Sequence, residues 1–362
     1  NYRYNIKLDC VLTKALVICI FPFQNCVMSS EESTEDMWEA AEHGNVARLV
    51  ALIAAKANVD GKDWCDLTPL HMAAGEDQSD AVKVLLDAKA TVDIKDGRGM
   101  TPLHWAVVKG HVGSIQVLLD AKARLYSQED GDASSLLLAA LRGDVKSIQS
   151  LIESKTNVDA HENVLRMASL HLAALCGRSD VVKVLIDAKA TVDIKNAQDS
   201  TPLGGAAGNG HTDTVQILID AKAAVNAKSK YDSTPLHSAC YDGHSVAAQL
   251  LIDAKATIDA KNDVGATSLH FAAANGHTET VRVLIEAKAI VNVKDNVGQT
   301  PLHWTANHAY HDIVRMLFAS GADATIVDDD GMTAAEVTEN NGETATADLL
   351  RSFNTVKEPL AL

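Results

Sequence analysis

The chain has 362 residues, of which 47% are hydrophobic, so it is long and apolar enough to bury a large core. Its 32 lysines and arginines stand against 48 acidic residues, a formal net charge of −16 at pH 7. A surface this acidic repels phosphate backbones, which argues against nucleic acid as a direct ligand and favours a basic or apolar protein partner.

Residues 1–27 do not share the pattern of the rest of the chain. Their apolar run at 15–21 is too short to span a bilayer but would suit the core of a signal peptide. The acidic stretch 29–36 is typical of a disordered lead-in, so we favour Met28 as the natural start. We therefore predict a cytoplasmic protein without membrane association. The alternative is a secreted or membrane-tethered protein, if residues 1–27 are a real signal.

One motif then recurs along the chain. Thr-Pro-Leu-His begins at Thr68, Thr101, Thr234 and Thr300, and degraded copies begin at Ser134, Ala168, Thr201, Thr267 and Thr333. The spacing is 33 residues at every step except that from Ser134 to Ala168, which is 34. A fixed period of this length predicts a repeat fold instead of several globular domains.

The unit at Thr101 shows what each copy is expected to form. Thr101 can cap a helix N-terminus, and Pro102 suits the first helical position. Gly110 ends this first helix, and an apolar stripe over 115–119 predicts a second. A polar turn that contains glycine, at 96–99, precedes the pair. Because neither helix is long enough to be stable alone, stacked units must bury their apolar faces in one continuous core.

The Thr-Pro-Leu-His-x-Ala-Ala, Gly-His and Leu-Leu motifs resemble those of the ankyrin repeat family, from about residue 35 to residue 350. The resemblance implies an all-α repeat solenoid of about ten helix-turn-helix units joined by β-hairpin-like turns. The expected divisions are a non-repeat segment (1–34), an N-terminal capping repeat (35–67), eight repeats (68–332), a C-terminal capping repeat (333–353) and an unstructured tail (354–362).

Two departures from the ankyrin pattern stand out. The family usually has glycine after the second helix, where the backbone turns left-handed, but here the slot holds lysine at Lys56, Lys89, Lys122, Lys155, Lys189, Lys222, Lys255 and Lys288. We expect these lysines to accept a positive φ and to interact with the helix C-terminus. The units at Ser134, Ala168 and Thr201 are the most degraded, and Gly204 and Gly205 weaken a first helix.

No constellation of residues indicates catalysis. The repeat explains most of the fourteen histidines and spaces them a layer apart, too far to share one metal ion. His308 and His311 are close in sequence but lack further ligands nearby. Motifs of the phosphate-loop, HExxH and GxSxG types are missing from the sequence. We therefore predict a protein that is not an enzyme, with no cofactor, no metal and no small-molecule substrate.

Cysteine usage bears on the compartment. Cys65, Cys176 and Cys240 fall in units that are two or three layers apart, beyond the reach of a disulfide. Free thiols in the body of the protein favour a reducing compartment.

Function is expected on the surface. The resemblance to ankyrin proteins implies that a partner protein binds on the concave face, at the turn tips and the exposed ends of the first helices. We expect a monomeric scaffold, adaptor or targeting module. The alternative is the regulatory or substrate-recruiting part of a larger enzyme, such as a kinase or ubiquitin ligase.

The candidate binding residues are those at the turn tips and first-helix ends whose types anchor interfaces. They are Trp64, Arg98, Leu141, Arg142, Leu165, Leu175, Tyr231 and Tyr241. Leu175 could instead pack against the next layer.

Overall fold

The computed structural model describes residues 32–123, 131–305 and 310–355. Met28, the apolar run at 15–21, His308 and residues 356–362 lie outside these ranges, as do the cysteines among the first 27 residues. The chain divides into two compact units, unit 1 up to Gln198 and unit 2 from Asp199, and each is described by itself.

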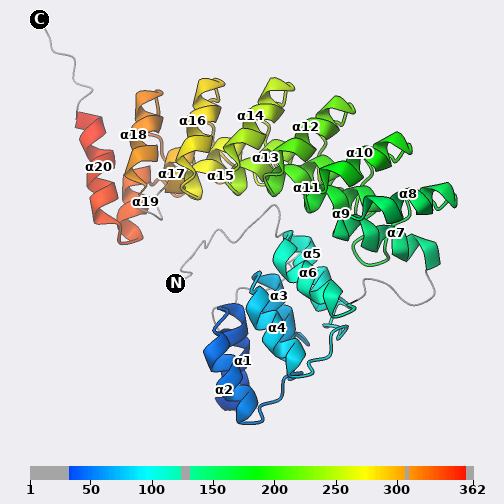
Figure 1. Ribbon diagram of the computed structural model, residues 1–362. Coiled ribbons are helices and arrows are strands. Elements are labelled where there is room, and N and C mark those ends of the chain that lie inside the picture. The colour runs from blue at the N-terminus through cyan, green and yellow to red at the C-terminus, as the bar shows by residue number, and fades with distance from the viewer. Residues whose placement is uncertain (1–31, 124–130, 306–309, 356–362) are drawn as a thin grey trace, which may run out of the picture. The chain divides into compact units, whose positions relative to one another are not determined.

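Unit 1 is built from successive pairs of short antiparallel helices (Figure 1). The helices α1 and α2 pack against α3 and α4, which pack in turn against α5 and α6, and α7 and α8 pack against α9 and α10 in the same way. Their bounds are α1 (Glu32–Glu42), α2 (Val46–Ala54), α3 (Pro69–Gly75), α4 (Ser79–Asp87), α5 (Pro102–Lys109), α6 (Val112–Asp120), α7 (Gly131–Arg142), α8 (Val145–Glu153), α9 (Ser169–Leu175) and α10 (Ser179–Asp187).

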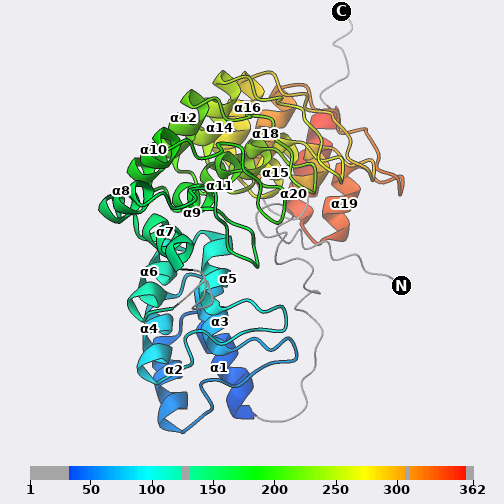
Figure 2. The same ribbon diagram turned by 90° about the vertical axis from the view of Figure 1, so that its right-hand side faces the viewer.

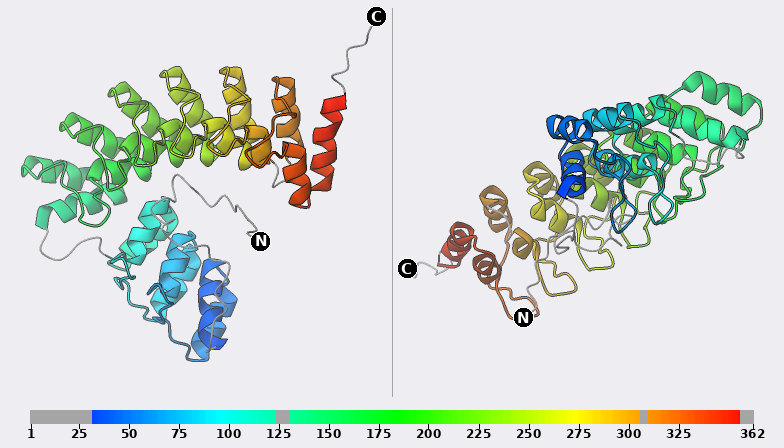
Figure 3. Two further views of the ribbon diagram at one scale, coloured as in Figure 1. Left: turned by 180° about the vertical axis from the view of Figure 1, so that it is seen from behind. Right: turned by 90° about the horizontal axis from the view of Figure 1, so that it is seen from below.

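Unit 2 continues the same architecture, and every pair packs on the next, first helix against first and second against second (Figure 3). The bounds are α11 (Pro202–Gly208), α12 (Thr212–Asp220), α13 (Pro235–Tyr241), α14 (Ser245–Asp253), α15 (Ser268–Ala274), α16 (Thr278–Glu286), α17 (Pro301–Trp304), α18 (His311–Ala319), α19 (Ala334–Asn340) and α20 (Thr344–Thr355).

The all-α repeat fold expected from the sequence is confirmed. Within the described residues, the only β-type pairings are isolated bridges, His161 with Ala168 and Val327 with Thr333. The turns before α3 and α5 project on the side of the odd-numbered helices (Figure 2). At the ends of the repeat array, α1 begins three residues before the expected boundary, and α20 extends two residues past residue 353.

Local sequence explains where the helices begin and end. Thr101 precedes α5 in an extended conformation, and its hydroxyl accepts a hydrogen bond from the His104 amide at 3.4 Å. Pro102 occupies the first helical position, where its missing N–H costs nothing. Gly110 ends α5 with a φ of 71°, a left-handed conformation that glycine adopts without steric cost. The predicted start and stop signals of this unit are thus confirmed.

The core lies between the layers and consists mainly of leucine, valine and alanine. Leu85 and Val82 of α4 are fully buried, as are Leu70 and Ala73 of α3. Burying a leucine side chain contributes about 1.5–3 kcal/mol relative to leaving it exposed. Since α3 and α4 have only seven and nine residues, this burial against neighbouring layers, not helix propensity, holds them in place.

The expected left-handed lysines are present. All eight have positive φ, between 64° and 71°, and Gly321 takes the same slot with a φ of 91°. Each lysine follows the last residues of a second helix; Lys89, for example, comes two residues after the end of α4. Steric strain at positive φ opposes the favourable interaction of the cation with the helix C-terminus.

The first prediction concerns this slot. Lys89→Gly should leave the free energy of unfolding unchanged or raise it by up to about 1 kcal/mol, because glycine relieves the strain while the dipole interaction is lost. Urea denaturation monitored by circular dichroism measures the difference. A loss of well over 1 kcal/mol, repeated in Lys255→Gly, would show that the lysines make specific stabilising contacts.

The second prediction concerns Gly204, which replaces the motif histidine in α11. Its backbone amide still reaches the Thr201 hydroxyl, at 3.4 Å. An added Cβ would lie 3.1 Å from the Ser200 hydroxyl, which would have to shift by only a few tenths of an ångström. Gly204→Ala should therefore raise the free energy of unfolding by about 0.5–1 kcal/mol. Gly110→Ala is the matched control, and it should destabilise because of its positive φ. Destabilisation by Gly204→Ala would contradict the argument.

Candidate protein-binding surface

Each turn is built around a side chain that holds its own backbone. In the first complete turn, Asp63 Oδ1 accepts hydrogen bonds from the amides of Cys65 at 2.8 Å and Leu67 at 2.7 Å. The Leu67 carbonyl accepts a further bond from the Trp38 indole at 3.0 Å. These bonds turn the backbone outward between Asp63 and Leu67, so that Trp64 stands at the tip with 65% of its surface exposed.

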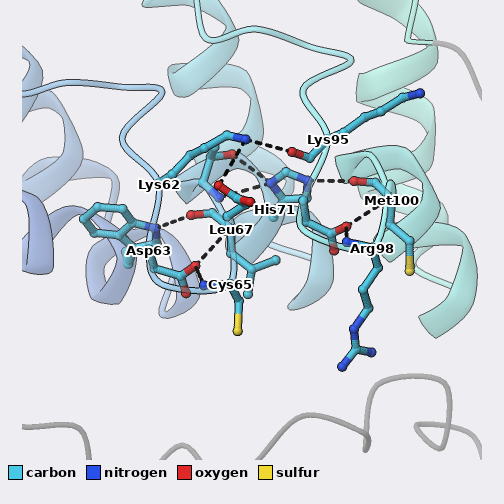
Figure 4. Close-up of polar contacts among 12 residues, drawn as sticks. Lys62, Asp63, Cys65, Leu67, His71, Lys95, Arg98 and Met100 are labelled. Atoms are coloured by element: carbon cyan, nitrogen blue, oxygen red, sulfur yellow. Dashed lines mark hydrogen bonds and ion pairs between the residues drawn. The ribbon is translucent and has the colours of Figure 1, made fainter.

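The next turn repeats the arrangement and is tied to the first (Figure 4). Asp96 Oδ1 accepts from the amides of Arg98 and Met100, at 2.9 and 2.8 Å. The Gly97 amide donates to the Cys65 carbonyl at 3.0 Å, and the Lys62 ammonium donates to the Lys95 carbonyl at 3.0 Å. Figure 4 shows the Cys65 and Arg98 side chains extending on the same side of the paired turns. Adjacent tips thus form one continuous surface.

Four of the eight predicted partner-binding residues are accessible. Trp64, Arg98 and Arg142 are exposed, and Tyr231 is half-buried. Arg142 donates from Nη2 to the Leu119 carbonyl at 3.3 Å, which anchors its guanidinium. Trp64 and Arg98 lie on neighbouring turns of unit 1 that are joined by the hydrogen bond from the Gly97 amide to the Cys65 carbonyl.

The expected exposure of the other four residues is wrong. Leu141, Leu165, Leu175 and Tyr241 are buried, with 0%, 1%, 7% and 9% of their surfaces exposed. Leu141 lies in α7, which is covered by both α8 and α9, and Leu175 lies in α9, which is covered by α7 and α10. The Tyr241 ring packs against Phe271 of the next repeat, with 5.9 Å between ring centroids.

Leu165 has a different reason for its burial. Its turn contains the extra residue of the 34-residue spacing, and Val164 lies at the surface with 40% exposure. Leu165 points inward, and its carbonyl accepts from the Ala197 amide at 2.8 Å. Besides Val164, the accessible apolar tip residues that the prediction left out include Val264 and Val297, at 41% and 52% exposure. The sequence could have identified them, because they follow Tyr231 by one and two 33-residue repeats and so occupy the same slot.

The histidines of the motif join one repeat to the next. His71 Nδ1 accepts from the Thr68 amide at 3.1 Å, and Nε2 lies 3.2 Å from the Met100 carbonyl in the next turn. His237, His270 and His303 make the equivalent contact with the carbonyl 29 residues later, each at 3.2 Å. This geometry requires the proton on Nε2, so these histidines are neutral structural donors.

His104 departs from this pattern. Its Nε2 lacks a hydrogen-bond partner and lies 4.0 Å from Glu162 Oε2, and both side chains are buried. Burial lowers the pKa of His104 to about 4 and raises the pKa of Glu162. Burial therefore favours the neutral form of both groups, and we regard the contact as a weak one.

Within the described residues, no three side chains that could ligate a metal ion lie together. Cys65, Cys176 and Cys240 are free thiols, and burial raises the pKa of Cys176 to about 11 and raises that of Cys240 further, which makes both unreactive. None of the described helices has the length and apolar character needed to cross a membrane.

Comparisons with known proteins agree with this architecture. A sequence model of ankyrin repeats (three copies) matches residues 37–129, 170–262 and 248–328, well over half of the chain. The chain therefore belongs to the ankyrin repeat family. The unmatched stretch between residues 129 and 170 includes the degraded unit at Ser134.

Among 538 matching chains of solved structures is the crystal structure of the human ASB11 ankyrin repeat domain. It shares 25% sequence identity with this chain and superposes with a TM-score of 0.54. The alignment covers 60% of this chain and 97% of the ASB11 domain. A search of curated protein sequences finds no match.

The third prediction is a loss of stability in mild acid. Burial lowers the pKa of His237 from 6.5 to about 4 and that of His270 to about 3. The unfolded chain protonates these histidines more readily than the folded chain does. Their contribution to the free energy of unfolding is therefore fully present above pH 6.5 and is lost as the pH falls toward 4. Each histidine should lower the free energy of unfolding by about 2 kcal/mol between pH 7 and pH 5.

Urea denaturation at the two pH values measures the loss. The variant His237→Gln should lose about 2 kcal/mol less than the unmodified chain. His43→Gln, at an exposed position, is the control and should lose as much as the unmodified chain. An identical loss in all three proteins would rule out His237 as a source of the acid sensitivity.

Proposed function

We propose that this chain is a non-catalytic scaffold, adaptor or targeting module that binds a partner protein through its turn tips. The observation that carries the proposal is the exposure of Trp64 and Arg98 on two turns that are hydrogen-bonded to each other. Tryptophan and arginine dominate the binding energy of protein interfaces. A tryptophan with 65% of its surface in water gains most of its burial energy only when a partner covers it.

The character of the partner follows from charge. Asp66, two residues after Trp64, is exposed and forms an ion pair with Lys62 at 3.4 Å, and the chain as a whole carries a net charge of −16. A partner with an apolar group for Trp64 and basic groups around it would complement this surface. Arg98 would then contact an acidic group or a backbone carbonyl at the edge of the interface.

We infer that the chain acts as a monomer in the cytoplasm. The free thiols of Cys65, Cys176 and Cys240 support a reducing compartment.

The fourth prediction tests the tips of unit 1. After affinity purification and mass spectrometry identify a partner, calorimetry should show that Trp64→Ala and Arg98→Ala each weaken binding by about 1–3 kcal/mol. Thermal unfolding should be unchanged, because both side chains lie at the surface.

Matched controls come from the second helices. Val50 is 52% exposed on α2, and Lys83 is exposed on α4, where it forms an ion pair with Asp80 at 2.9 Å. Val50→Ala and Lys83→Ala should leave the affinity unchanged. Losses confined to these second-helix positions would contradict binding through the turn tips.

A further inference from the structure

Three successive turns of unit 2 carry apolar side chains in one slot. We call Tyr231, Val264 and Val297 the tip row. Tyr231 is half-buried, whereas Val264 and Val297 are 41% and 52% exposed. Asp295 holds the last of these turns by accepting from the Val297 and Gln299 amides, at 3.0 and 2.8 Å. The row therefore stands on backbone that is fixed by its own turn.

Hydrogen bonds between turns set the spacing of the row. The Tyr231 carbonyl accepts from the Asp263 amide at 3.0 Å, and the Val264 carbonyl accepts from the Asn296 amide at 3.0 Å. The path from one residue of the row to the next thus runs through one backbone carbonyl, one hydrogen bond and one intervening residue. With standard backbone dimensions this path is at most about 10 Å long, and packed helix layers are about 8–10 Å apart.

This spacing discriminates between backbone conformations of a bound segment. A polyproline II helix has three residues per turn and a rise of about 3.1 Å, so the same face recurs every ~9.3 Å. A β-strand presents the same face every ~6.7 Å, which does not match the row. An α-helix presents one face at every turn, about 5.4 Å apart, so only alternate turns would meet the tips and a seven-residue apolar repeat would be needed.

The surroundings of the row are acidic. Asp263 is exposed beside Val264, and Asp329 and Asp330 are exposed on the turn that follows that of Val297. Among the ion pairs of the described residues, none involves these three carboxylates. Of the nearby cations, Lys230 is exposed beside Tyr231, and two others are engaged along the turns. Lys261 donates to the Lys294 carbonyl at 2.7 Å, and Lys228 forms an ion pair with Asp232 at 3.3 Å. A bound segment would meet apolar contacts flanked by unneutralised carboxylates.

We propose that the tip row binds a basic segment in the polyproline II conformation with an apolar side chain at every third position. The proposal rests on the proposed function, because it assigns a partner chemistry to turn tips that are already taken to bind protein. Apolar side chains of the segment contact Tyr231, Val264 and Val297, and its arginines or lysines face Asp263 and Asp330. A polyproline II segment loses little conformational entropy on binding.

The experiment uses the full chain and a synthetic probe. A fluorescein-labelled peptide of four Val-Pro-Arg triplets should bind, as measured by fluorescence anisotropy. Val264→Ser and Val297→Ser should each raise its dissociation constant about tenfold. Val246→Ser is the matched control, because Val246 is 61% exposed on α14, and this change should have no effect. All three positions are at the surface, so each variant should fold, as checked by circular dichroism.

Three comparison peptides test the chemistry of the segment. Four Val-Pro-Glu triplets should not bind, and a peptide of the probe's composition with all valines at one end should bind at least about tenfold more weakly. A helical peptide with valines at every seventh position and arginines elsewhere should also bind more weakly. Equal binding by any of the three, no binding of the probe, or equal effects of Val246→Ser and Val297→Ser would overturn the proposal.

The two proposals can fail separately. If a partner protein loses affinity with Trp64→Ala but the probe does not bind, the tip row is wrong and the proposed function stands. If partner binding is insensitive to every turn-tip substitution, the proposed function fails whatever the probe does.

Discussion

The constraint on which this structure depends is the shortness of its helices. Most first helices have seven or eight residues and most second helices nine, for example α9 and α10. Isolated helices shorter than about 12–15 residues are marginal in water. The helices persist because Leu170 and Val182 are buried between layers, with at most 1% of their surfaces exposed. Stability is therefore a property of neighbouring repeats together, and a repeat that packs poorly weakens both of its neighbours.

The same constraint explains how the polar motif residues are used. Stacked layers bury polar groups at each turn, and every one of them needs a partner. Thr68 and His71 satisfy the start of α3, and the His71 imidazole then reaches the Met100 carbonyl of the next turn. Asp96 fixes its own turn and also accepts from the Trp105 indole at 3.0 Å. Residues that look like catalytic groups in the sequence are thus engaged in holding the layers together.

The proposed function uses positions that the repeat motif leaves variable. The tips between the turn-holding residues differ from one unit to the next: Trp64, Gly97 and Lys230 occupy equivalent places. The backbone hydrogen bonds between turns hold these varied side chains at a regular distance. Such a surface is rigid before a partner arrives, which lowers the entropic cost of binding.

Sequence alone determined the repeat length, the helix starts at Thr101 and Thr333, and the left-handed lysine slot represented by Lys89. The repeat length follows from the spacing of the motif, the helix starts from local chemistry such as a cap or a proline, and the lysine slot from the resemblance to the ankyrin pattern. It also identified which slots form turn tips. Tertiary structure decided which side chains in those slots are accessible. Tyr241 is buried because Phe271 of the next repeat covers it, and Leu165 because its turn has an additional residue. Exposure depends on side chains about 33 residues away, and a periodic pattern names the slot of a residue without showing what lies against it.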